Sequence, residues 1–315
     1  MLGAVDTAVI GHLEDAYNLA AVAIGSTIIQ FIYWGFGFLR MGMGGLTAQA
    51  LGSRDAPEVR ALFLRGAYIG IAIGLILWIL QSLILGFSLS LFDGSRETKS
   101  LAAVYFEIRV WSAPAVLLNY CLIGWFIGMQ NTRAILYLQV FMNGLNIILD
   151  LFFVLELGWG VAGVAIATLI AEVAAVIVGL IIFRREVNHY DPGGKAGEVW
   201  DLVKIKRTLS INLDIFVRTV SLLFAFAFFT SQASGFGDIT IAAHLVLIQF
   251  QLFMAFGLDG FAHAAEALVG SSIGAKNHLA LRHAVIVSSK WAVGVALGYT
   301  VVYLIFGEII ISLLT

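Results

Sequence analysis

A few charged side chains lie within segments of this sequence that otherwise consist almost entirely of Leu, Ile, Val, Ala, Phe and Gly. They are Asp6, Asp150, Asp214, Arg218, Asp259 and Glu266. A charged group inside a lipid bilayer costs roughly 2.5 to 3.5 kcal/mol on insertion scales, so such groups are rare there and usually belong to substrate or ion pathways. Their presence predicts a transport or ion-binding site within a membrane.

The composition is that of a polytopic membrane protein. Of the 315 residues, 60% are hydrophobic and only 12% are charged, whereas soluble domains average about 25% charged residues. The sequence has 33 Gly and 3 Pro, which suits long lipid-embedded helices that pack closely through small residues. The single Cys121 excludes a disulfide framework, and no basic patch indicates a nucleic-acid partner.

The apolar segments predict an all-α integral membrane protein, because a spanning helix needs about 20 mostly apolar residues. Helices are expected over 17–50, 60–91, 100–128, 133–155, 160–184, 207–232, 239–273 and 283–313, with a helix too short to span over 1–12. The polar segment 185–206 is interpreted as a cytoplasmic linker. It would join an N-terminal lobe, 1–184, to a partial C-terminal lobe, 207–315.

The Lys and Arg residues concentrate in alternate loops, which predicts the orientation of the chain. Arg54, Arg133 and Lys276 each lie in such a loop, and the linker 185–206 is also basic. Cytoplasmic loops carry the excess of Lys and Arg. These loops are therefore expected to face the cytoplasm.

An internal repeat relates the two halves at an offset of 222 residues. Gly52 aligns with Gly274 and Arg54 with Lys276 at this offset, which also superposes helix boundaries. Weak internal symmetry of this kind is typical of transporter folds, and an even number of intervening helices makes the repeat parallel. The same offset leaves the first helix short and the helices of residues 94–184 without partners, so the sequence is expected to be truncated at both ends.

Polar groups of three helices are predicted to meet at one depth. Asp6, Asp150 and Thr168 each lie about 10 to 12 Å below the predicted outer boundary, at a rise of about 1.5 Å per residue. Asp150 also ends a polar stripe on one helix face, formed by Gln139, Asn143, Asn146 and Asp150. Carboxylates that share a site of low dielectric constant hold a proton more tightly than they do in water, which suits a proton carrier. The alternative is a hydrogen-bond network that only fixes helix packing.

A second polar cluster is predicted in the other half, nearer the cytoplasm. Asp214 and Arg218 are one turn apart, and Asp259, His263 and Glu266 share one helix face. Arg218 and Asp259 come to similar depths, so they can pair across helices. A structural ion pair and a role in gating or substrate binding remain as alternatives. The histidines do not supply a metal motif, so no metal site is predicted.

Four further cations lie in apolar segments. Arg65 and Lys290 are expected to extend toward the nearby interface. Arg40 and Arg109 lie deeper, but each is alone in its helix. We interpret both as structural, with a functional role as the alternative.

Other functional classes lack their sequence signals. An integral membrane enzyme would need clustered metal-binding carboxylates or a nucleophile with an oriented base, and neither is present, so the chain is not expected to be an enzyme. A structural or sensory bundle would leave the intramembrane carboxylates without a role.

Several motifs resemble the multidrug and toxic compound extrusion (MATE) family, in its DinF-like bacterial branch. They are VDTAVIGHL (5–13), GLTAQALGSRD (45–55), GWGVAGVAIAT (158–168), NLDIFVRT (212–219) and LDGFAHAAEALVG (258–270), together with the pair Asn146 and Asp150. The resemblance covers nearly the whole chain, in order.

The resemblance implies a two-lobe helical bundle with a parallel pseudo-twofold repeat, of which this sequence has about 9 of 12 helices. It implies a multi-pass antiporter of the bacterial inner membrane, expected as a monomer, that exports cationic or amphiphilic compounds by alternating access. No cofactor is expected, and the coupling ion is H⁺ or Na⁺. A lipid or polyisoprenoid flippase of the same superfamily and an inactive fragment are the alternatives.

The family's coupling residues fall on matching positions of this sequence. They are Asp6, Asn146, Asp150 and Thr168 in the N-terminal half. Members of this branch also have charged residues at the positions of Asp214, Arg218, Asp259 and Glu266 in the C-terminal half. The sequence departs from the family pattern where the inner half of the first helix is missing. The resemblance implies that this helix bends when its Asp changes protonation, and the missing half is part of that helix.

Overall fold

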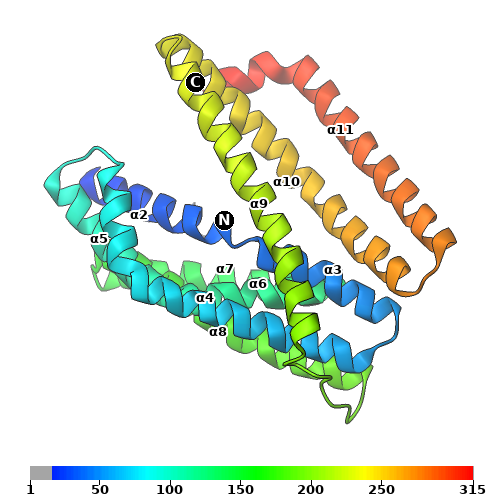
Figure 1. The fold of residues 1–315 in the computed structure, drawn as a ribbon. Coiled ribbons are helices and arrows are strands. Elements are labelled where there is room, and N and C mark those ends of the chain that lie inside the picture. Colours follow the sequence, from blue (N-terminus) through cyan, green and yellow to red (C-terminus); the bar gives the residue numbers. More distant parts are fainter. Residues whose placement is uncertain (1–15, 315) are drawn as a thin grey trace.

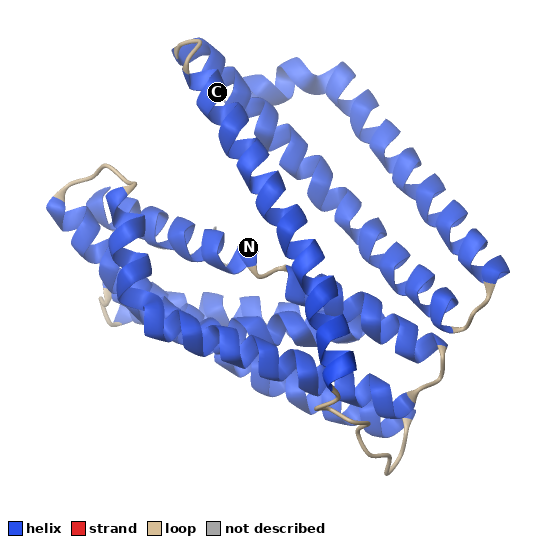
Figure 2. Cartoon of the chain, viewed as in Figure 1, coloured by secondary structure: helices blue, strands red, loops and turns tan. Residues whose placement is uncertain are grey.

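The computed structural model describes residues 16–314, in which every regular element is a helix (Figures 1 and 2). The α-helices are α2 (Ala16–Gly35), α3 (Phe38–Gly52), α4 (Ala56–Ser90), α5 (Arg96–Arg109), α6 (Ala113–Gly128), α7 (Thr132–Asp150), α8 (Gly160–Tyr190), α9 (Leu202–Ser234), α10 (Asp238–Gly274) and α11 (His278–Leu314). A 3₁₀ turn, η1 (Val110–Ser112), and a π-helical segment, η2 (Leu151–Glu156), complete them. Eight candidate spans within the described residues are long and apolar enough to cross a membrane, which confirms the predicted fold class.

The predicted helix over 17–50 is two helices in the structure. It breaks at Phe36 and Gly37, between α2 and α3, where glycines flank the turn and favour the helix least among residues other than proline. The predicted helix over 100–128 is also interrupted, by the turn η1. Pro114 follows in the first turn of α6, where its missing N–H leaves no helical hydrogen bond unmade.

The linker has less irregular structure than the sequence indicates. Helix α8 continues to Tyr190 and α9 begins at Leu202, so the segment between the two helices is 191–201. Its Gly197 N–H donates to the carbonyl of Pro57 at 2.8 Å. The segment is therefore held against the start of α4.

The turns after α3 and α10 repeat one geometry at the 222-residue offset. Arg54 and Lys276 have positive φ angles of 57° and 51°. The next residues, Asp55 and Asn277, accept a hydrogen bond from the backbone N–H three positions later, at 3.1 and 3.0 Å. The structure thus carries the same helix connection at both copies of the repeat.

Helix α3 packs closely against α10 through a reciprocal pair of contacts. A Cβ atom built on Gly52 would lie 1.9 Å from the carbonyl oxygen of Ser271, and one built on Gly274 would lie 1.9 Å from that of Gln49. Gln49 and Ser271 are themselves related by the repeat offset, so the contact has pseudo-twofold symmetry. Only glycine permits this approach of two helix backbones.

The two groups of helices meet at this end and diverge at the other. Figure 1 shows α9 crossing α3 and α10 ending beside it, while toward the opposite end α9 and α10 lean away from α2 and α5. The buried core lies within the N-terminal group, where Trp125 of α6 donates to the carbonyl of Val59 at 3.0 Å. This packed group forms the wall of a cavity.

Candidate functional site

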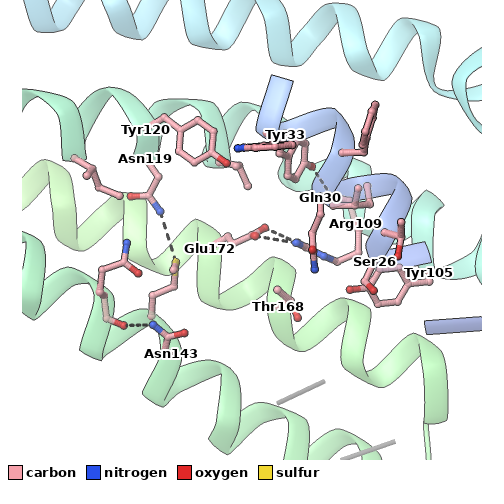
Figure 3. A pocket seen from close by; sticks show the side chains of 18 of the residues that line it. Ser26, Gln30, Tyr33, Tyr105, Arg109, Asn119, Tyr120, Asn143, Thr168 and Glu172 are labelled. Carbon is pink, nitrogen blue, oxygen red and sulfur yellow. Dashed lines mark hydrogen bonds and ion pairs between the residues drawn. The ribbon is translucent and has the colours of Figure 1, made fainter. Parts of the chain in front are cut away.

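A cavity of about 1050 Å³ lies among α2, α5, α6, α7 and α8. Leu252 and Phe256 of α10 reach it from the C-terminal group. Its lining mixes aromatic rings with uncharged polar groups, as Figure 3 shows; these include Ser26, Gln30, Tyr33, Tyr105, Asn119, Tyr120, Gln139, Asn143 and Thr168. Such a surface suits a ligand that is apolar over most of its area and polar at a few points.

The predicted polar stripe of α7 lies beside this cavity. Gln139 and Asn143 line it, and Asn143 Nδ2 donates to the carbonyl of Gln139 at 2.7 Å. Asn146 and Asp150 follow on the same helix face and are both fully buried. The stripe therefore leads from the cavity lining into the contact between α7 and α8.

Asn146 and Thr168, two residues at positions that match the family's site, are in contact. Asn146 Nδ2 donates to Thr168 Oγ1 at 3.1 Å, and the hydroxyl of Thr168 donates to the carbonyl of Val164 one turn earlier. Asp150 lies one turn beyond Asn146 on α7. Asp6, the fourth predicted member of this site, lies outside the described residues.

A buried ion pair that the sequence did not predict crosses the cavity wall. Arg109, the last residue of α5, binds both carboxylate oxygens of Glu172 on α8, with N···O distances of 2.5 and 2.8 Å. Their side chains are 6% and 7% exposed. Arg109 was interpreted as alone in its helix, but α5 also carries Glu107 and, in its first turn, other charged residues. The partner of Arg109 nevertheless lies on another helix, one turn from Thr168.

The ion pair is fixed at the end of α5 by two hydroxyl groups. Arg109 Nη1 also donates to Ser112 Oγ at 3.0 Å. Tyr33 of α2 donates its hydroxyl to the backbone carbonyl of Arg109 at 3.1 Å. Figure 3 shows Arg109 between Glu172 and the α2 residues Tyr33 and Gln30.

The second predicted cluster is not a single site. Asp214, Arg218 and Asp259 are exposed, and the pair of Arg218 with Asp259 that their similar depths allow is not formed. The guanidinium of Arg218 is directed toward α3 instead, where its Nη2 lies 3.2 Å from Met41 Sδ. This pairing prediction is therefore wrong for this structure.

His263 and Glu266 lie together on α10, as their spacing predicts. Their Nδ1 and Oε2 atoms are 3.7 Å apart. The carboxylate of Glu266 is directed at α3, because a Cβ atom built on Gly44 would lie 2.6 Å from its Oε1. Among the described residues, no group of three or more His, Cys, Asp or Glu side chains is arranged to hold a metal ion.

Arg65 extends toward the end of α4 at the basic loops, as expected, but it ends in a buried ion pair there. Its side chain is 2% exposed and binds Glu58 Oε1 at 2.6 Å. Lys204, near the start of α9, binds the other oxygen of Glu58 at 2.8 Å. Glu58 thus joins the N-terminal group of helices to α9 at the end where the basic loops lie.

Known proteins resemble this chain over most of its length. The MatE family model matches residues 1–152 and 215–315. The chain is 37% identical over 315 residues to DNA damage-inducible protein F of Escherichia coli (strain K12), and it spans 69% of that protein. It is 27% identical over 259 residues to the Multidrug export protein MepA of Staphylococcus aureus, covering 79% of this chain and 56% of that protein.

Solved structures share the fold. One described as the outward-facing conformation of a multidrug resistance MATE family transporter matches with a TM-score of 0.84 and 21% identity, over 100% of this chain and 70% of that one. Another, described as a MATE in the bent conformation, matches with a TM-score of 0.87 and 20% identity, over 97% and 68%. The chain therefore spans about two thirds of these structures and about half of some curated relatives.

Proposed function

Because this chain belongs to the MatE family of transporters, we propose that it exports cationic or amphiphilic compounds in exchange for H⁺ or Na⁺. It is a multi-pass protein of the bacterial plasma membrane and a transporter, not an enzyme, as its apolar helices and its family indicate. The class of the exported compound and the coupling ion are our proposals.

The observation that carries the proposal is the position of Asp150 beside the cavity. Asp150 is fully buried on α7, one turn from Asn146, which binds the cavity residue Thr168. Burial of a carboxylate is costly unless a proton or a positive charge neutralises it. A proton, Na⁺ or a cationic substrate would each neutralise it, so binding of one favours release of another.

Either coupling ion can be accommodated by the neighbouring oxygens. The Oδ1 atom of Asn146 accepts no hydrogen bond from the described residues, and it lies one turn from Asp150. It could accept a hydrogen bond from a protonated carboxyl group or serve as an oxygen ligand for Na⁺. We favour H⁺ because a pair of acids, Asp6 and Asp150, offers few further oxygen ligands.

Alternating access is supported by a difference between the two ends of the molecule: the two groups of helices are packed together at one end and separated at the other. At the end with the basic loops, Gly52 and Gly274 make their reciprocal contacts, and Arg207 of α9 binds Gln49 of α3 at 2.9 Å. At the other end, the two groups of helices diverge (Figure 1). With the basic loops in the cytoplasm, this state would be open to the outside.

Transport driven by an imposed pH gradient tests the proposal. We would reconstitute the full-length protein in liposomes and follow ethidium, with Asp6→Asn and Asp150→Asn as test variants and Asp93→Asn, in an exposed turn, as the control. We expect the test variants to lose gradient-driven transport and the control to keep it. Retained proton-driven transport in both test variants would refute the proposed roles.

A further inference from the structure

We propose that Arg109 sets the charge of the cavity by neutralising Glu172, so that the cavity accepts compounds with one positive charge and disfavours those with two. The inference rests on the proposed function, because it concerns the substrate of the same site. It makes the pair of Arg109 and Glu172 a determinant of specificity.

The described lining of the cavity contains one cationic and one anionic side chain, and these two bind each other. They are Arg109 and Glu172; every other lining residue is uncharged. The guanidinium keeps its charge at any relevant pH. The guanidinium and the carboxylate form one ion pair, so their formal charges cancel.

The geometry of the pair leaves Glu172 committed to Arg109. Both carboxylate oxygens accept a hydrogen bond from the guanidinium, at 2.5 and 2.8 Å. Ser112 and the hydroxyl of Tyr33 hold the end of α5 in place. A bidentate pair of arginine and carboxylate is the strongest kind of ion pair between side chains. To bind Glu172, an ammonium group of a substrate would have to displace the buried guanidinium of Arg109.

A single positive charge can still find a counter-charge near the cavity. Asp150 lies buried behind the contact of Asn146 with Thr168, whose side chain lines the cavity. A second positive charge on the same ligand would enter a surface that carries no free anion among the described residues. A charge placed there without a partner is strongly disfavoured.

Ethidium and propidium form a matched pair of probes for this inference. They share the phenanthridinium ring, but propidium carries a second, quaternary ammonium. We would titrate both dyes by fluorescence into the purified full-length protein, and compare the ratio of their affinities in the wild type, Arg109→Gln and the double variant Arg109→Gln/Glu172→Gln.

We expect the wild type to prefer ethidium. Arg109→Gln frees the carboxylate of Glu172 and should shift the affinity ratio toward propidium by about tenfold or more, since a second ion pair forms at low dielectric constant. The double variant should return the ratio to that of the wild type. Arg65→Gln, which breaks a buried pair with Glu58 away from the cavity, is the control and should leave the ratio unchanged.

A second variant keeps the inference testable if Arg109→Gln does not fold. Glu172→Gln leaves the cation of Arg109 without its partner, so the affinity for ethidium should fall by about tenfold. An unchanged ratio in folded Arg109→Gln, an unchanged ethidium affinity in Glu172→Gln, or a propidium gain that persists in the double variant would each overturn the inference. A wild-type protein that binds neither dye would instead contradict the proposed function, and the inference with it.

Discussion

Asn146 on α7 and Thr168 on α8 are joined by a hydrogen bond of 3.1 Å in a part of the bundle where their exposed fractions are 0% and 1%. The bond fixes the helix that carries Asp150 to the helix that carries Glu172. A buried amide donor that loses its hydrogen-bond partner costs the desolvation penalty of that group. The contact therefore serves both the stability of the lobe and the geometry of the proposed site.

Thr168→Val should destabilise the protein by about 1 to 3 kcal/mol, because it leaves the amide of Asn146 buried without its acceptor. It should also weaken ethidium binding. Thermal unfolding in detergent and a dye titration would measure the two effects. The matched control is Thr208→Val on α9, a residue 2% exposed whose hydroxyl binds only the carbonyl of Lys204 within its own helix. Equal losses in both variants would contradict a special role for the interhelical bond.

Gly274→Ala should separate α3 from α10 at the end of the basic loops. The added methyl group would lie 1.9 Å from the carbonyl oxygen of Gln49, which is backbone and cannot yield without moving the helix. We expect faster labelling of a Gln49→Cys variant by a thiol reagent when Gly274→Ala is also present. The native Cys121 is buried and gives a low background.

Gly298→Ala on α11 is the control for this experiment, because a Cβ atom there meets open space. It should leave the labelling rate unchanged. If Gly274→Ala labels no faster than Gly298→Ala, the reciprocal glycine contact does not hold this end closed.

The sequence predicted the spans and the repeat because both depend on composition along the chain. The apolar length of each segment fixes where a helix can cross a bilayer, and the turns at Arg54 and Lys276 share residues at a constant offset. The stripe that contains Asn146 was also predictable, since residues three and four apart share a helix face. Each of these features can be read from a single segment.

The features that the sequence did not predict depend on which helix faces which. Arg109 and Glu172 are 63 residues apart, and periodicity gives the face of each but not the neighbour that it meets. For the same reason, Arg218 was assigned to Asp259, whereas its guanidinium is directed toward Met41 on α3. The break at Gly37 was missed because glycine is common throughout these helices and rarely interrupts them.

Glu58→Gln should destabilise the protein more than removal of Lys204. Glu58 is the partner of Arg65, whose side chain is 2% exposed, and loss of one member of a buried pair costs about 3 to 5 kcal/mol. Lys204 has a side chain that is 40% exposed, and a solvent-exposed pair contributes about 1 kcal/mol or less. Thermal unfolding of Glu58→Gln and Lys204→Met should give this order, and the reverse order would show that the contact to α9 is the stronger one.

Gln130→Gly should stabilise the protein by up to about 1 kcal/mol, because a left-handed backbone is unfavourable for a residue with a Cβ atom. Gln130 has a φ angle of 59° in the turn between α6 and α7, and its side chain is exposed. Arg54 and Lys276 have the same conformation, but their charges belong to the basic loops that set the orientation. A substitution of Gln130 therefore changes the backbone preference of the turn without changing the charge of a basic loop.

The β-branched variant Gln130→Val should change the stability of the protein in the opposite direction, by destabilising it. Valine tolerates positive φ angles less well than glutamine, so the midpoint of thermal unfolding should rise in Gln130→Gly and fall in Gln130→Val. Ethidium binding should be the same in both, since the turn lies away from the cavity lining. Equal midpoints would show that the turn relaxes out of the left-handed conformation, and the shared geometry of the turns after α3, α6 and α10 would then not be required for the fold.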